Sequence, residues 1–120
     1  MMIETTLTGL IKAFCPQTYP VVAPKGKKAP FITYTRVSTP RLRSFDGPMG
    51  MAMPTFRVDV YAASFDAAKA LAAAIRLKLD GYRDTEISDC NCINEQDMGD
   101  LTSTPELSRI NLEFRITHSE

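Results

Sequence analysis

Two stretches of the chain carry apolar residues at the spacing of a helix face. The first lies within residues 3–14 and is expected to end before Pro16, because the residue that precedes a proline avoids helical angles. The second follows Ser64, a good N-capping residue, and reaches Gly81, where a C-terminal cap is expected. The apolar positions of the first helix are Ile3, Leu7, Leu10, Ile11 and Phe14, and those of the second are Ala68, Leu71, Ala72, Ile75, Leu79 and Tyr82.

Three segments have the composition or the alternation of β-strands. Residues 31–37 are rich in aromatic and β-branched side chains, which suit a half-buried sheet surface. In residues 56–62 and 107–117 apolar and polar residues alternate, which predicts one buried and one solvated face. Weaker signals predict a strand at 87–94 and, at best, an edge strand in the proline-punctuated segment 19–24.

The segment between the first two strong strands, residues 38–55, contains three prolines and two glycines. Asp46-Gly47 fits the tip of a hairpin, so this segment predicts a long β-hairpin arm. Strands joined in this way are antiparallel. The sequence therefore predicts a single α+β domain over residues 1–120, in which two helices pack on one face of an antiparallel sheet of roughly four to five strands.

The composition is that of an ordinary globular domain, with 44% hydrophobic and 23% charged residues. No apolar run is long enough to span a bilayer, and no basic patch precedes an apolar stretch at the N-terminus, so we expect neither membrane insertion nor a signal peptide. The net charge is zero, but residues 1–60 hold eight basic and three acidic residues and residues 61–120 hold six basic and eleven acidic ones. This asymmetry suits head-to-tail association of identical chains, unless the two halves interleave in the fold.

No catalytic motif is present, and His118 is the only histidine. Three cysteines, two of them in Cys90-Asn91-Cys92, are too few and too closely spaced for a zinc site and are expected to pack as thiols. Asp59 falls on the solvated face of its strand. The sequence therefore predicts no enzyme, no metal site and no cofactor.

The predicted arm carries the residues that best fit a contact between subunits. Three methionines stand at strand spacing, and methionine adapts to irregular binding surfaces; the alternative is that the arm folds back and they fill the chain's own core. The candidate interface residues of the arm are Arg41, Arg43, Phe45, Met49, Met51 and Met53.

Charged residues outside the arm fall into a basic and an acidic set. The basic residues could face a DNA-filled lumen or a neighbouring subunit, the acidic ones could receive a neighbour's arginines, and solvated surface charge is the simpler alternative for each. The basic set is Lys25, Lys27, Lys28 and Arg36, and the acidic set is Glu95, Asp97, Asp100 and Glu106.

A succession of short motifs resembles the phage tail-completion proteins over nearly the whole chain. After the first helix come Tyr19-Pro20 through Pro24 and Gly26, then Pro30-Phe31-Ile32-Thr33-Tyr34. Asp46-Gly47 follows in the arm, and Arg57-Val58-Asp59-Val60-Tyr61-Ala62 precedes a helix that ends in Leu79-Asp80-Gly81. Each motif is short, and their order makes the resemblance specific.

The resemblance implies a tail terminator or tail-to-head joining protein, with no catalytic residues to carry over. Such proteins form rings, typically hexamers, that cap the tail tube. The implied partners are further copies of the chain, the tail tube protein, the head connector protein, and DNA that passes through the lumen without sequence recognition. The expected location is the bacterial host cytoplasm during assembly and then the virion tail or neck.

Two other interpretations stay open on the residues alone. One is a head-side neck or connector component. The other is a monomeric ligand-binding α+β domain, which would need a closed pocket with converging polar groups.

Overall fold

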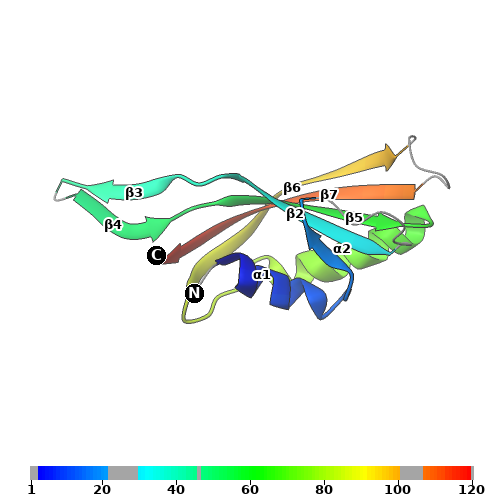
Figure 1. Ribbon diagram of the computed structural model, residues 1–120, viewed down its shortest axis with the longest axis horizontal. Helices are drawn as coiled ribbons and strands as arrows, with labels where there is room; N and C mark the ends of the chain where they lie inside the picture. The colour runs from blue at the N-terminus through cyan, green and yellow to red at the C-terminus, as the bar shows by residue number, and fades with distance from the viewer. Residues whose placement is uncertain (1–2, 22–29, 46, 101–106, 120) are drawn as a thin grey trace.

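Figure 1 shows the computed structural model of the chain, which describes residues 3–21, 30–45, 47–100 and 107–119. The chain forms a twisted, open sheet of seven strands with two helices, and it extends over 54 × 24 × 23 Å. The elements are α1 (Ile3–Lys12), β1 (Thr18–Pro20), β2 (Phe31–Ser38), β3 (Arg41–Ser44), β4 (Gly47–Ala52), β5 (Thr55–Ala62), α2 (Phe65–Leu79), β6 (Ile87–Asp100) and β7 (Leu107–Ser119).

The predicted α+β class is confirmed, and both helices lie on the same side of the sheet (Figure 1). The predicted count of four to five strands is wrong, because the sheet has seven. The described strand pairs are antiparallel as predicted, except that β1 is parallel to β2, so the sheet is mixed. Pro40 lies between β2 and β3 and Pro54 between β4 and β5, and a proline has no N–H for a continuous ladder, so each long strand is divided. β1 runs parallel to β2, with Thr18 opposite Ile32 and Pro20 opposite Tyr34.

The order across the sheet is β1-β2-β5-β7, with β6 on the far side of β7. β4 pairs with the end of β7 through Met51 and Ala52 and with β3 along its length. The segment expected at 87–94 is a strand that runs to Asp100, longer than predicted. Its polar second half has no periodicity that a sequence pattern could detect, and it is ordered by pairing with β7.

The second helix forms as its sequence predicts. The Ser64 hydroxyl accepts a hydrogen bond from the Ala67 N–H at 3.2 Å and caps the N-terminus. Asp66 lies in the first turn and Arg76 in the last, where each charge complements the helix dipole. The buried face contains Ala68, Ala72, Ile75 and Leu79, and its alanines let the helix approach the sheet closely.

The hydrophobic core lies between the helices and the sheet. Cross-strand pairs from β5 and β7 fill its centre, and α1 adds Leu7 and Ile11, which are both fully buried. Burial of each such side chain contributes roughly 1.5–3 kcal/mol. The central pairs are Phe56 with Phe114, Val58 with Leu112, and Val60 with Ile110. Among the described residues, no helix has the length and apolar character needed to cross a membrane.

Candidate interface for assembly

The β3–β4 hairpin lies at the end of the molecule that the helices do not cover (Figure 1). β3 continues the direction of β2 and β4 leads into β5, and the Met53 N–H donates to the Pro40 carbonyl at 2.8 Å where the two divided strands meet. Ser44 pairs with Gly47, so the turn consists of residues 45 and 46. The predicted tip, Asp46-Gly47, falls here, but Asp46 is outside the described residues.

The hairpin departs from regular pairing at one point. Arg41 pairs with Ala52 and Arg43 with Pro48, so β4 contains extra residues between the two pairs. Gly50 has φ +71°, a left-handed angle that glycine adopts without steric cost. This bulge increases the local twist of the hairpin and sets it off from the plane of the main sheet.

The predicted arm residues differ in exposure. Phe45 is fully exposed, with a relative exposure of 111%, and Arg41 and Arg43 are also exposed. Met51 and Met53 are partly buried, and the backbone of Met49 lies in β4, with its side chain outside the described part of the structure. The structure therefore presents an aromatic tip flanked by arginines. Whether these residues contact a neighbour remains a prediction.

The predicted basic set is divided. Arg36 on β2 forms an ion pair with Glu4 of α1, and its guanidinium lies 5.4 Å above the Phe56 ring. Lys25, Lys27 and Lys28 lie outside the described residues. Arg36 thus has a structural partner within the chain, which sequence reasoning could not identify.

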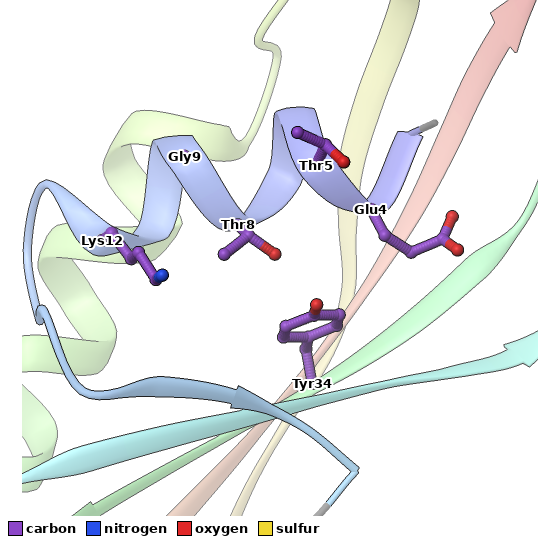
Figure 2. A pocket seen from close by; sticks show the side chains of 6 residues that line it. All are labelled: Glu4, Thr5, Thr8, Gly9, Lys12 and Tyr34. Carbon is purple, nitrogen blue, oxygen red and sulfur yellow. The ribbon is translucent and has the colours of Figure 1, made fainter. Parts of the chain in front are cut away.

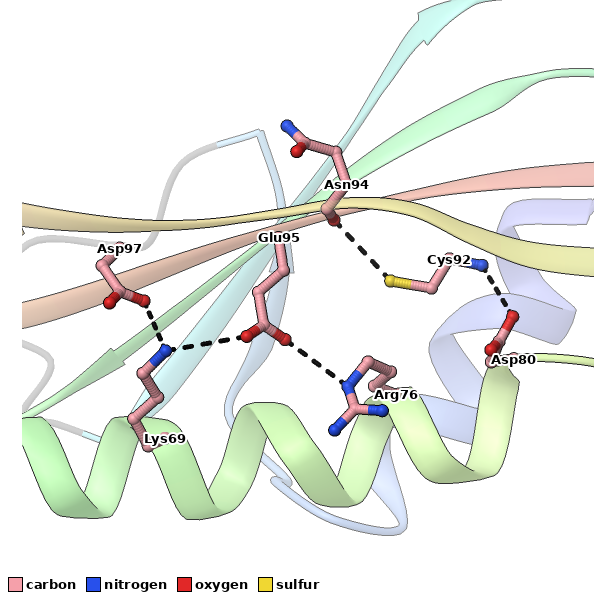
Figure 3. Close-up of polar contacts among 7 residues, drawn as sticks. All are labelled: Lys69, Arg76, Asp80, Cys92, Asn94, Glu95 and Asp97. Carbon is pink, nitrogen blue, oxygen red and sulfur yellow. Dashed lines mark hydrogen bonds and ion pairs between the residues drawn. The ribbon is translucent and has the colours of Figure 1, made fainter.

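The described members of the acidic set face α2 from β6 (Figure 3). The Lys69 ammonium lies 2.6 Å from the Asp97 carboxylate and 3.6 Å from that of Glu95, and Arg76 lies 3.5 Å from Glu95. The hydrogen bond that the Lys69 ammonium donates to the Asp97 carboxylate raises the pKa of Lys69 above its ordinary value. Asp100 belongs to β6, although its side chain is not described, and Glu106 lies outside the described residues.

A polar cluster on the helix-free face of the sheet escaped the sequence analysis. Asp59 is only 5% exposed, and its carboxylate accepts hydrogen bonds from Asn111 at 2.9 Å and from the Arg109 guanidinium at 3.2 Å. Arg109 also lies 5.5 Å above the Tyr61 ring, which stacks on Phe31. The expectation that Asp59 is solvated is therefore wrong, because it is buried through partners about fifty positions away in the sequence.

A shallow pocket of about 420 Å³ lies between α1 and β2. Figure 2 places Glu4 and Lys12 at opposite ends of it, with the Tyr34 hydroxyl pointing toward the helix. Lys12, Thr5 and Gly9 are exposed, so the pocket is open to solvent. Its polar groups do not converge on one point, as they do in a typical small-molecule site.

Cys90 and Cys92 lie in surroundings that keep their thiols protonated. Burial raises the pKa of Cys90 to about 12, and burial also raises the pKa of Cys92. Both thiols therefore stay protonated near neutral pH, whereas nucleophilic or metal-binding cysteines react as thiolates. Within the described ranges of the chain, no group of histidine, cysteine, aspartate and glutamate residues could hold a metal ion.

This chain is similar to known proteins in both sequence and fold. The profile of the family described as tail completion protein gp17 matches residues 5–119. No curated protein matches the chain. Among the solved structures, 25 chains match, including one from the virion of a native gene transfer agent particle. That chain is 19% identical, the match covers 92% of this chain and 84% of that one, and the TM-score is 0.66, which establishes a shared fold.

Proposed function

The chain belongs to the family of tail completion protein gp17, and we propose that it forms a hexameric ring that ends the tail tube and joins it to the head. This family consists of structural phage tail proteins and is not a class of enzymes. The family match over residues 5–119 carries the assignment to the tail. The shared fold with a chain of a gene transfer agent virion supports a place in a particle of the phage type.

The β3–β4 hairpin supports the proposed ring. It extends beyond the helix-covered part of the chain (Figure 1). Its end carries Phe45, which is fully exposed among the residues that the structure describes. A hairpin on one side of a subunit and its receptor on another give a heterologous contact, which closes into a ring when the rotation between subunits allows it. Arg41 and Arg43 make the hairpin side of this contact basic, which favours an acidic surface as its receptor.

The proposed partners follow from the position of such a ring. One face of the ring meets the tail tube protein, the opposite face meets the head connector protein, and DNA passes through the lumen without sequence recognition. Lys25, Lys27 and Lys28 are the candidates for lumen phosphates or a neighbouring subunit. Arg36 is the weaker candidate of this set, because Glu4 already neutralises its charge.

A binding assay with purified tail tubes tests the proposed function. We expect the wild-type chain to sediment with the tubes, and the double variant Arg41→Glu, Arg43→Glu to unfold in one cooperative transition but to stay in the supernatant. Equal sedimentation of the variant at physiological salt would show that these arginines do not hold the ring. A wild-type chain that ignores the tubes at every ratio would contradict the tail-terminating function itself.

A further inference from the structure

The outer edge of β6 is divided into a capped and an open half. In the first half, the Cys92 N–H donates to the Asp80 carboxylate at 3.0 Å (Figure 3). The Gly81 N–H donates to the Cys90 carbonyl at 2.6 Å. Gly81 has φ +82°, which lets the chain turn directly after α2 and reach the strand. The Cys90 carbonyl and the Cys92 N–H are therefore both satisfied inside the chain.

A bulge between Cys92 and Asn94 marks the start of the open half, Asn94–Asp100. Along this half, β6 pairs with β7 on one side, and no other strand of the described residues pairs with its second side. Glu95 and Asp97 alternate with Asn94 and Gln96, and the alternation of an antiparallel ladder turns the backbone groups of Glu95 and Asp97 outward. Unpaired groups of this kind are a template for pairing with another chain.

The side chains of the open half leave this edge accessible. The carboxylates of Glu95 and Asp97 are held on the helix side of the sheet by Lys69 and Arg76, and they do not cross the edge (Figure 3). Asp97 still keeps 54% of its side-chain surface exposed. The edge therefore combines backbone groups that no second described strand pairs with and two carboxylates that Lys69 and Arg76 bind on the helix side, of which Asp97 stays about half exposed.

We propose that the open half of β6, Asn94–Asp100, receives β3 of a second copy of this chain by strand addition. This inference rests on the proposed function, because it names the receptor of the hairpin. Among the described residues, β4 is the one strand that pairs with β3, so no described strand lies along its outer edge. Its four residues include Arg41 and Arg43, which complement the carboxylates beside the β6 edge.

The geometry of one chain requires that the contact joins two copies. The hairpin lies at one end of the 54 Å long axis, and β6 runs to its open half at the other end (Figure 1). A hairpin therefore cannot reach the β6 edge of its own chain. Each copy offers one hairpin and one receiving edge, and repetition of this contact generates a closed ring or a filament.

Hydrogen exchange at single amides tests the receiving edge in the wild-type chain. The chain is exchanged alone and bound to tail tubes, and is then dissociated for readout. We expect the amides of Glu95 and Asp97 to exchange quickly in the free chain and to slow by about 100-fold or more in the assembly. The amides of Asn94 and Gln96, which face β7, serve as matched controls and should be protected in both states.

Two outcomes would overturn the inference, and they are distinguishable. If the chain binds the tubes and oligomerises while Glu95 and Asp97 stay unprotected, the receiving edge is elsewhere and the proposed function stands. If the chain neither binds tubes nor oligomerises, both proposals fail.

Variants that exchange the charges test the pairing of hairpin and edge independently. The variant Arg41→Glu, Arg43→Glu and the variant Glu95→Lys, Asp97→Lys should each assemble at least about 10-fold more weakly than the wild type, and an equal mixture of the two should recover assembly. Amide exchange along β7 verifies that both variants fold. Folded variants that fail equally when mixed would refute the proposed pairing.

Discussion

Removal of the Phe45 ring should separate assembly from folding. The side chain is fully exposed in the single chain, at 111% relative exposure, so Phe45→Ala removes no buried contact. Its cost to the free energy of unfolding should stay within about 0.5 kcal/mol, as for other exposed positions. If a neighbouring subunit covers the ring in the assembly, the variant loses roughly 1.5–3 kcal/mol at each contact between subunits. That loss weakens each contact by about 10- to 150-fold.

Sedimentation velocity over a range of protein concentrations, with and without tail tubes, measures this effect. Leu77→Ala is the matched control, because Leu77 is a large apolar residue that is 74% exposed on α2. Urea unfolding of both variants verifies that the fold is intact. We expect the control to assemble like the wild type. The reasoning is refuted if Phe45→Ala assembles as well as the control, or if it loses stability before any assembly occurs.

Three further predictions concern the single chain. Asp59→Ala should lower the free energy of unfolding in urea by about 3 kcal/mol, because it leaves Arg109 unpaired beside a buried site; a loss below about 1 kcal/mol would show that the cluster is not stabilising. Hydrogen bonds lower the pKa of the Asp84 carboxyl, and the bond from the Ile87 N–H has the largest effect. The carboxylate of Asp84 should therefore contribute to the free energy of unfolding above pH 3.8, and this contribution should disappear as the pH falls through the lowered pKa. In thermal unfolding, Asp84→Asn should remove part of the acid sensitivity, and an unchanged pH profile would contradict this assignment. Because burial raises the pKa of Cys90 to about 12, alkylation followed by mass spectrometry should modify Cys92 before Cys90 in the folded chain, and the reverse order would contradict the described packing.

The elements that the sequence predicts are those whose structure is visible in the apolar periodicity of a single segment. α2 and β5 each bury one regular face, so their apolar periodicity identified them directly. The second half of β6 has polar residues on both faces and is ordered only by its ladder with β7, so no local pattern predicted it. The parallel pairing of β1 with β2 joins residues that are not neighbours in the sequence, so local residues do not encode it.

The candidate interface residues stay a prediction, drawn from the strand spacing of the methionines and the charge of the arginines in the hairpin segment. The sequence could not show that Lys69 and Arg76 already bind Glu95 and Asp97, because helical and strand residues far apart in the chain come together only in the folded structure. The same limit applies to Asp59, whose partners lie on β7.

Electron microscopy of tail tubes assembled with and without this protein tests the central proposal most directly. The account predicts that tubes stop at a uniform length and carry an additional ring at one end only when the protein is present, and that the ring is lost with Arg41→Glu, Arg43→Glu. Tubes of the same length distribution without an added ring in both preparations would contradict it and would favour a position on the head side of the neck.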